Sequence, residues 1–522
     1  MDTAAARTIT DLPERFNAAE DLLAPNLAHH PGKSAVIDHR GTCSYADLAD
    51  RVARMAGVFE ALGVQRDHRV LLCLTDTRDF PTVFLGAIRA GVVPVPLNTL
   101  LTEDDYAWIL NNSDAHAVFV SAELAGKWRG IAEREPHVHF VSSEGGAQPS
   151  LGDDLESLLA DVQPALEPAA THRDDVAFWL YTSGSTGRPK GATHAHGSLR
   201  LTANLYGLGT AGIREDDVVF SVAKQFFAYG LGNALTFPYA AGATVVLFNG
   251  RATPDAISDL LARNKVSVLC GVPTFFAGWL ASETPPLPDL RLALSAGEAL
   301  PAHIGRAFNE RFGADVLDGL GSTEMLHVFV SQRPGEVRHG CTGRVVDGYK
   351  VRVVDDAGAD LAPGEIGSLH VCGPTTATGY WRNRSKSLTT FCGEWTVTGD
   401  KYVIDAEGWL TYSGRADDML KVGGIYVSPI EVEEALANHP DVLEAAVVGA
   451  EDADGLVKPL AYVVLHNDVA PREGLEAALK AHVKDSLAPY KYPRWITFVD
   501  DLPKTATGKI QRFRLRTAGE PT

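Results

Sequence analysis

The segment YTSGSTGRPKG, residues 181–191, combines three glycines with four serine or threonine hydroxyls, an arginine and a lysine. Glycine permits backbone angles that other residues avoid, while Ser183, Ser185 and Thr186 offer hydroxyl donors and Lys190 offers a positive charge. A loop of this composition can wrap a polyphosphate. It does not fit the G-x-x-x-x-G-K-[ST] pattern of the ordinary P-loop, and taken alone it could also be a mobile surface turn.

The elements around this segment predict an α/β fold. From about residue 176, apolar runs typical of strands, such as VAFWLYT and VSVLCGV, alternate with stretches typical of helices, such as PDAISDLLARN. This alternation indicates βαβ units and a parallel sheet, and the first 150 residues repeat the theme. We therefore expect a large N-terminal domain, residues 1–414, built from parallel-sheet βα subdomains.

The pattern changes toward the C-terminus. Between about residues 341 and 414, short β segments are separated by Gly and Pro, which predicts a small β-barrel-like part of the N-terminal domain. After Arg415 helices return, and Ser428 followed by Pro429 is a typical helix start. We expect residues 415–522 to form a small α+β C-terminal domain.

The composition excludes several classes of protein. The chain has 522 residues and a formal net charge of -19, which argues against nucleic acid as a general partner because phosphate backbones bind cationic surfaces. The N-terminus lacks the apolar core of a secretory signal, and no run reaches the length of a membrane span. The six cysteines show neither a C-x-x-C pair nor zinc spacing. We expect a soluble cytoplasmic protein with no membrane partner, and a homodimer is one open alternative for its oligomeric state.

Seven motifs occur in order along nearly the whole chain. They are YTSGSTGRPKG, KQFFAYGLG (224–232), SAGEAL (295–300), DGLGSTEM (318–325), WTVTGD (395–400), GRADDMLKVGGIYVSPIEVE (414–433) and PKTATGKIQR (503–512). In these motifs the sequence resembles the adenylate-forming enzymes, which include acyl- and aryl-CoA ligases, firefly luciferase and peptide-synthetase adenylation domains. The resemblance implies that a carboxylate attacks the α-phosphate of ATP to give acyl-AMP and pyrophosphate, and that a thiol then takes the acyl group.

The resemblance also implies which residues bind ATP and magnesium. Glu324 should bind Mg²⁺, with Thr323 beside it at the α-phosphate, and one Glu is adequate where phosphates supply other ligands. Asp400 should accept the two ribose hydroxyls, assisted by Arg415, because an ionised carboxylate only accepts hydrogen bonds. The other residues expected to bind ATP are Thr182, Ser183, Gly184, Ser185, Thr186, Gly187 and Lys190 at the phosphates, and Gly297, Glu298 and Asp318 at adenine.

Lys509, in PKTATGKIQR, is the expected catalytic lysine. Its ammonium should reach both the substrate carboxylate and the α-phosphate, because buried anions are costly unless they are paired. Without the motif, a solvated lysine in a basic tail would be the favoured interpretation. In the family the C-terminal domain is mobile and rotates about the position of Asp417, which implies that Lys421, Gly423 and Gly424 then approach CoA.

The segment KQFFAYGLG should line the acid-binding pocket. The residues expected there are Phe226, Phe227, Ala228, Tyr229, Gly230, Gly319, Gly321 and either His327 or His339. Aromatic walls favour a planar substrate, because paired rings gain about 0.5–1.5 kcal/mol beyond the burial of their area. Phe227 lies where peptide-synthetase domains carry an aspartate for the substrate ammonium, so we do not expect an amino acid.

With this pocket, the sequence is most similar to the benzoate–CoA ligases. It therefore predicts an acid–thiol ligase of aromatic degradation that joins benzoate, or a close ring analogue, to CoA with ATP and Mg²⁺. A substituted benzoate, cyclohexanecarboxylate or a medium-chain acid is an alternative substrate, and an enzyme that loads a carrier protein or oxidises acyl-AMP is an alternative class. A non-catalytic acyl-nucleotide-binding protein would be expected to lack Lys509 or Glu324, and both are present.

Overall fold

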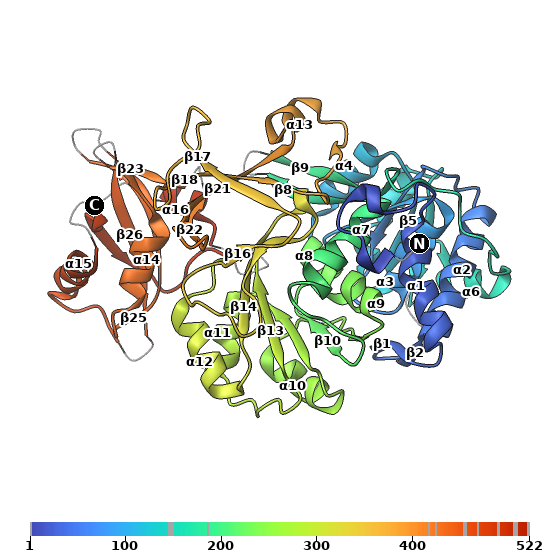
Figure 1. Cartoon of the computed structure of the whole chain (residues 1–522), viewed down its shortest axis with the longest axis horizontal. Helices are drawn as coiled ribbons and strands as arrows, with labels where there is room; N and C mark the ends of the chain where they lie inside the picture. The colour runs from blue at the N-terminus through green and yellow to red at the C-terminus, as the bar shows by residue number, and fades with distance from the viewer. Residues whose placement is uncertain are drawn as a thin grey trace. The chain divides into compact units, whose positions relative to one another are not determined.

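The protein is described by a computed structural model that covers residues 3–144, 151–184, 187–415, 418–422, 425–452, 457–466, 469–487, 491–504 and 510–518 (Figure 1). The chain forms two compact units. The first comprises Met1–Lys350 and Val371–Thr396, and the second comprises Val351–His370 and Val397–Thr522. Part of the predicted β-rich segment thus belongs to the second unit, while the domain boundary at residue 415 remains a prediction.

The largest sheet of the first unit has nine strands and a parallel centre. Its order is β16-β15-β14-β13-β12-β10-β11-β1-β2. Pairing is parallel from β14 to β1 and antiparallel for β16, β15 and β2. The bounds are β1 (Ser34–Asp38), β2 (Gly41–Ser44), β10 (Val218–Ser221), β11 (Thr244–Val246), β12 (Val268–Gly271), β13 (Leu292–Ala296), β14 (Val316–Gly321), β15 (Val328–Ser331) and β16 (Arg344–Val345). The parallel centre confirms the α/β prediction.

Two further sheets complete the first unit. A parallel sheet of order β4-β3-β5-β6-β7 is formed by the N-terminal residues. Its strands are β3 (Arg69–Cys73), β4 (Val93–Pro96), β5 (Ala115–Ser121), β6 (His139–Ser143) and β7 (Asp153–Asp154). A three-stranded sheet of order β19-β9-β8 contains β8 (Val176–Gly184), β9 (Gly187–Ala195) and β19 (Gly379–Tyr380). This last sheet carries Thr182 and Lys190 of the candidate site.

Helices of the first unit begin where the sequence offers a cap or a proline. Ser44 accepts a hydrogen bond from the backbone of Asp47 at the start of α2, and α10 begins at Pro254 as the sequence predicts. The helices are α1 (Ala18–His29), α2 (Tyr45–Ala61), α3 (Asp79–Ala90), α4 (Glu103–Ser113), α5 (Arg129–Arg134), α6 (Leu155–Asp161), α7 (His196–Thr202), α8 (Ala228–Leu231), α9 (Phe237–Ala241), α10 (Pro254–Arg263), α11 (Pro273–Ala281), α12 (Ala302–Phe312) and α13 (Arg384–Thr390). Short 3₁₀ or π turns are η1 (Thr3–Ala5), η2 (Ile9–Asp11), η3 (Ala122–Lys127), η4 (Ala203–Leu208), η5 (Gly232–Thr236) and η6 (Thr323–Met325).

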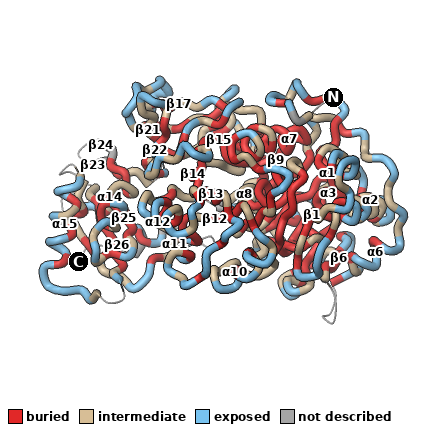
Figure 2. Tube along the Cα trace, turned by 60° about the horizontal axis from the view of Figure 1, so that its bottom comes forward, coloured by how far each residue is buried: buried red, intermediate tan, exposed pale blue. Residues whose placement is uncertain are grey.

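The cores of the two units are distinct. In the first unit, Phe84 and Phe178 belong to a large cluster between α1, α2, α3 and the sheets, and Trp128 belongs to a second one. In the second unit, Val447 and Leu479 belong to a smaller cluster. Figure 2 shows the buried residues along β1, β12 and β13, and along β25 (Val442–Glu451) and β26 (Val457–Leu465). Among the described residues, none of the helices combines the length and the apolar character needed to cross a bilayer.

The C-terminal segment forms the predicted α+β arrangement. Ser428 caps α14 by accepting from the backbone of Glu431, which confirms the predicted helix start. A three-stranded sheet of order β25-β26-β27 packs with α14 and α15. The elements are α14 (Pro429–Ala437), α15 (Leu475–Ser486), α16 (Arg512–Ala518), β23 (Leu420–Val422), β24 (Ile425–Val427), β25 (Val442–Glu451), β26 (Val457–Leu465) and β27 (Trp495–Phe498).

The predicted β-rich segment contributes a small sheet, one strand of the large sheet and β19 of the three-stranded sheet. The small sheet contains β17 (Lys350–Val354), β18 (Gly367–Cys372), β20 (Phe391–Cys392), β21 (Trp395–Ile404) and β22 (Leu410–Arg415). Strand β21 pairs antiparallel with β20 and β22. Arg344–Val345 lies outside this sheet, because it pairs with β15 at the edge of the nine-stranded sheet.

Candidate functional site

The glycine- and hydroxyl-rich segment forms the tip of a β-hairpin. Strands β8 and β9 pair antiparallel, with Thr182 opposite Lys190 and Gly184 opposite Gly187. Ser185 and Thr186 lie outside the described residues, and of Ser183, Gly184 and Gly187 only the backbone is described. The pairing of β8 with β9 therefore fixes the backbone position of Lys190 near the tip of the hairpin.

Tyr380 connects this hairpin to a distant part of the chain. Strand β19 pairs with β9 so that Tyr380 lies opposite Ala192. The Lys190 Nζ atom lies 5.0 Å from the centre of the Tyr380 ring, within the range of a cation–π contact. The next residue, Trp381, stacks on Trp179 of β8 with ring centres 4.7 Å apart. Two aromatic contacts thus hold β19 against the hairpin.

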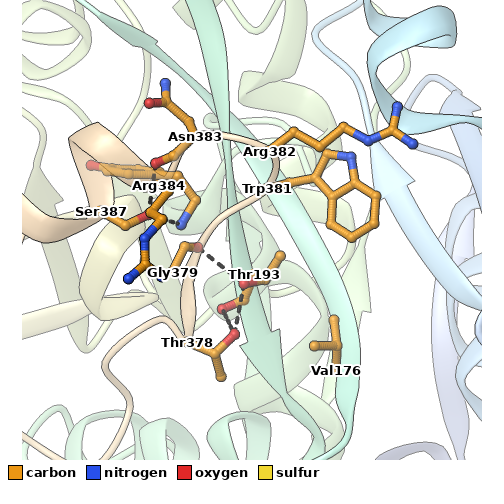
Figure 3. Close-up of a pocket in the computed structure, with 10 residues that line it drawn as sticks. Val176, Thr193, Thr378, Gly379, Trp381, Arg382, Asn383, Arg384 and Ser387 are labelled. Atoms are coloured by element: carbon orange, nitrogen blue, oxygen red, sulfur yellow. Dashed lines mark hydrogen bonds between the residues drawn. The ribbon is translucent and has the colours of Figure 1, made fainter.

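A cavity of about 590 Å³ opens beside β19. Figure 3 shows it bordered by Thr193 of β9, by Trp381 and by the arginines that follow. The Thr193 and Thr378 hydroxyls lie 2.6 Å apart, and Thr193 also donates to the carbonyl of Gly379. The hydroxyls of Thr193 and Thr378 and the carbonyl of Gly379, all in the lining of this cavity, are therefore hydrogen-bonded to one another.

Glu324 lies in the turn η6 and is held by several groups. Its Oε1 atom accepts a hydrogen bond from the Tyr380 hydroxyl at 2.5 Å, and its carbonyl accepts one from the backbone of Ala377 at 2.7 Å. The carbonyl of Thr323 is 2.8 Å from Nε2 of His194, a fully buried residue. Burial lowers the pKa of His194 to about 4, so the neutral ring donates to Thr323 near pH 7.

The geometry of Glu324 fits a magnesium ligand. The side chain is partly exposed, and within the described part of the chain its second carboxylate oxygen accepts no hydrogen bond. Magnesium is commonly held by one or two carboxylates together with substrate phosphates and water. A single acid with one open oxygen, in the same unit as Lys190, satisfies that requirement.

Asp318 is a buried acid with an unsatisfied atom. It lies on β14 opposite Ser295 of β13, at the end of β13 where Gly297 turns with φ +96° and Glu298 follows. Its Oδ2 accepts weakly from the backbone of Leu300 at 3.3 Å, while Oδ1 has no partner among the described residues. Burial raises the pKa of Asp318 well above its usual range. A hydrogen-bond donor from a ligand would satisfy Oδ1 and offset the free-energy cost of burying this group.

Asp400 and Arg415 form an ion pair in the second unit. They lie opposite one another in strands β21 and β22, and Nη1 of Arg415 is 2.9 Å from Oδ1 of Asp400. Asp400 is 9% exposed, whereas Arg415 is largely exposed. Gly399, with φ +78°, leaves room for the guanidinium, because a Cβ there would lie 3.0 Å from Nη2. The structure therefore brings together the two residues predicted at the ribose.

The aromatic residues predicted for the acid pocket form two separate sets of ring contacts. The rings of Phe226 and Phe227 are 4.5 Å apart, just before α8. Tyr229 stacks on His327 at 5.4 Å, and Phe237 meets the same histidine edge-on at 4.6 Å. His327 is buried, and burial lowers its pKa to about 3, so a neutral ring donates to the Tyr229 carbonyl. The histidine is therefore uncharged and is held among aromatic rings.

Two glycines of the predicted pocket lie in close contact with other backbone. A Cβ on Gly230 would lie 2.0 Å from the carbonyl oxygen of Lys224, and one on Gly321 would lie 2.7 Å from the carbonyl oxygen of His327. Gly319 is less crowded, with Val328 at 3.0 Å, and Ala228 begins α8. The other candidate histidine, His339, lies beside Gly305 of α12 instead.

The remaining predicted residues cannot be placed. Lys509, Asp417, Gly423 and Gly424 lie outside the described residues, and of Lys421 only the backbone, in β23, is described. Sequence reasoning did not single out Tyr380, because nothing in its local pattern relates it to an acid 56 residues earlier in the chain. The only local signal there is the sequence GYW at residues 379–381, in which a glycine precedes two aromatic residues.

Comparison with known proteins matches nearly the whole chain. The model for the family described as AMP-binding enzyme matches residues 23–381, and that for the AMP-binding enzyme C-terminal domain matches residues 431–509. A benzoate–CoA ligase of Thauera aromatica is 53% identical over 97% of each chain. A 4-hydroxybenzoate–CoA/benzoate–CoA ligase of Rhodopseudomonas palustris is 50% identical over 96% of this chain and 94% of its own. The solved structure of the anthranilate–CoA ligase AuaEII in complex with anthranoyl-AMP superimposes with a TM-score of 0.93, at 40% identity over 98% of both chains.

Proposed function

The chain belongs to the family of AMP-binding enzymes, and from that premise we propose that it is an ATP-dependent ligase that converts benzoate, or a close ring analogue, to its CoA thioester. The near full-length similarity to a benzoate–CoA ligase carries this proposal. The ring pairs Phe226–Phe227 and Tyr229–His327, with a neutral histidine, support an aromatic acid in particular. Relatives named for 4-hydroxybenzoate and anthranilate keep ring-substituted analogues open as substrates.

The proposed reaction has two steps. The carboxylate oxygen of benzoate attacks the α-phosphorus of ATP, and the bond to the β-phosphate breaks, which gives benzoyl-AMP and pyrophosphate. The sulfur of CoA then attacks the benzoyl carbonyl, the bond to AMP breaks, and the thiol proton is released. The protein mainly has to position two anions and balance the charge that builds on phosphorus.

The first unit supplies residues for the phosphates. Lys190 and the hairpin tip are proposed to hold the β- and γ-phosphates, and Thr323 is proposed to contact the α-phosphate. Glu324 is proposed to hold Mg²⁺ through its open oxygen. When bound, the ion would neutralise charge on the phosphate oxygens. Lys509 is proposed to pair the attacking carboxylate with the α-phosphate.

Adenosine and CoA complete the proposed set of contacts. The unsatisfied Oδ1 of Asp318 supports a role in accepting the adenine amino group, near Gly297 and Glu298. Asp400, with Arg415 beside it, is proposed to accept the ribose hydroxyls. A mobile C-terminal domain beginning at residue 415 and a hinge at Asp417 are part of the same proposal, with Lys421, Gly423 and Gly424 facing CoA. A homodimer and a cytoplasmic location remain predictions from the sequence.

An assay of AMP release tests the substrate class. The purified chain, ATP, Mg²⁺ and CoA are combined with benzoate, ring-substituted benzoates, cyclohexanecarboxylate or medium-chain fatty acids, and kcat/KM is measured for each. Benzoate or a ring-substituted benzoate should be preferred. In an apolar pocket, one added methyl-sized group changes specificity by roughly 10- to 200-fold. The acids in the series should therefore differ clearly in kcat/KM. A preference for the aliphatic acids would overturn the pocket assignment, and AMP release without CoA consumption would favour a different acceptor.

A further inference from the structure

We infer that Tyr380 is a positioning residue for the proposed magnesium–ATP complex, and that its hydroxyl and its ring act on different groups. The hydroxyl orients the Glu324 carboxylate toward the ion, and the ring face holds the Lys190 ammonium toward the phosphates. This inference rests on the proposed function, because it assumes that Glu324 and Lys190 act on the same nucleotide.

The hydroxyl of Tyr380 fixes one oxygen of Glu324. The 2.5 Å hydrogen bond engages Oε1, while Oε2 accepts no hydrogen bond among the described residues and is left for an ion. The donor is neutral, so it restrains the carboxylate without cancelling its charge. A lysine or arginine in the same place would also fix the side chain, but it would compete with a cation for that charge.

The ring of Tyr380 faces Lys190. The ammonium lies 5.0 Å from the ring centre, where the negative face of the ring attracts it. A flexible four-carbon side chain loses substantial conformational freedom when it is ordered. An aromatic surface that already holds the ammonium near the hairpin reduces the entropy that must be lost when the phosphates bind.

The position of Tyr380 is itself fixed. The side chain is 6% exposed, and its backbone pairs with Ala192 of β9. Its amide donates to Oγ of Ser387 at 2.9 Å. One residue pair away, the Thr193 and Thr378 hydroxyls join the two strands (Figure 3). Because these contacts restrain the strand and not the phenol oxygen, removing the oxygen should leave the ring in place.

The experiment uses Tyr380→Phe and Tyr380→Leu in the full chain. Binding of a non-hydrolysable ATP analogue is measured by calorimetry, once with EDTA and once with excess Mg²⁺. Tyr380→Phe should weaken binding about tenfold with Mg²⁺ and leave binding in EDTA unchanged, because a hydrogen bond to a charged group has been lost. Tyr380→Leu should weaken binding in both conditions, because the ring that faces Lys190 is also lost.

Tyr45→Phe is the matched control. Its hydroxyl is buried and donates to the carbonyl of Ala243 at 2.6 Å, so the variant loses a comparable hydrogen bond elsewhere in the first unit. It should lower the unfolding temperature and leave both affinities unchanged. If Tyr380→Phe does not fold, Tyr380→Trp serves as a second test, because it lacks the phenol hydroxyl but keeps an aromatic face, and it should show the same loss confined to Mg²⁺.

The outcomes separate the inference from the proposed function. Equal weakening of Tyr380→Phe with and without Mg²⁺, or no weakening in either condition, overturns the positioning role. If the native chain does not bind the analogue at all, or forms no acyl-AMP from any acid tested, the proposed function fails instead. A native chain that binds and reacts, with a Tyr380→Phe variant that behaves identically, refutes the inference alone.

Discussion

Glu324 in the first unit and Asp400 in the second are both acids predicted to face the nucleotide, but chemically different groups hold them. Glu324 accepts from the neutral hydroxyl of Tyr380, whereas Asp400 pairs with the guanidinium of Arg415. The first arrangement fixes a carboxylate and keeps its negative charge available. The second pairs the carboxylate with a cation, and an ionised carboxylate only accepts hydrogen bonds, so it suits neutral hydroxyl donors.

This difference matches the ligands proposed for each acid. A divalent cation needs the full charge of its ligand, because electrostatic attraction dominates its binding to oxygen. A ribose diol needs acceptors in the right place, and a nearby cation does not prevent them from accepting. The neighbour of each acid therefore predicts which substitutions will disturb metal dependence and which will disturb nucleotide affinity.

Glu324→Gln should have the largest effect. The amide keeps an oxygen that can accept from Tyr380, but it loses the charge that the ion requires. The rate of benzoate-dependent ATP–pyrophosphate exchange should fall on the order of 10²- to 10³-fold, as when one preorganised electrostatic contact is removed. More Mg²⁺ should recover part of the loss. An exchange rate near that of the native chain would show that Glu324 does not bind the ion.

Asp400→Asn should have an intermediate effect. The amide of the asparagine accepts hydrogen bonds through one oxygen only. Its NH₂ group is a donor, and it faces ribose hydroxyls that are donors in the native complex. KM for ATP should rise about 10- to 100-fold, because one or two hydrogen bonds to a charged acceptor are lost. The concentration of Mg²⁺ that gives half-maximal activity should not change, which makes this variant the charge-matched control for Glu324→Gln.

A substrate analogue sharpens this second prediction. The native chain should discriminate against 2′-deoxy-ATP, which lacks one of the two hydroxyls. Asp400→Asn should discriminate much less, because the acceptor that senses the hydroxyl is impaired. If the native chain and the variant show the same ratio of kcat/KM for ATP and 2′-deoxy-ATP, Asp400 does not accept a hydrogen bond from the ribose 2′-hydroxyl.

Local sequence patterns predicted the elements but not all of their partners. The helix Pro254–Arg263 and the Ser428 cap follow from proline, capping residues and apolar spacing, which act within a few residues. Arg344–Val345 was expected in the β-rich part, yet it completes the edge of the nine-stranded sheet. A two-residue strand carries too little pattern to select between edges, so its pairing is decided by tertiary contacts.

The same limit applies to the candidate site. The motifs pointed to Glu324 and Asp400, and the resemblance implied that Arg415 assists Asp400. The structure supplies the reason, because two neighbouring antiparallel strands bring Asp400 and Arg415 opposite each other. They did not reveal Tyr380, whose contacts with Glu324 and Lys190 depend on β19 joining β9. His194 likewise supports Thr323 from a neighbouring strand. Residues that support a motif from elsewhere in the chain leave little trace in the motif itself.

Arg415→Lys should have the smallest effect and tests the comparison most finely. The lysine keeps the positive charge but loses the planar fork that meets Asp400 at 2.9 Å. The Arg415 side chain is 47% exposed, and exposed ion pairs contribute about 0–1 kcal/mol, so KM for ATP should rise less than about fivefold. Salt screens such pairs, so the difference in KM between the variant and the native chain should shrink as NaCl is raised.

The effect of Tyr380→Phe on Mg²⁺-dependent binding should persist in the same salt series, because a short hydrogen bond from a neutral donor is not an ion pair. A Tyr380→Phe effect that vanished with salt would mean that the two acids are held by the same kind of force, and the contrast between them would fail.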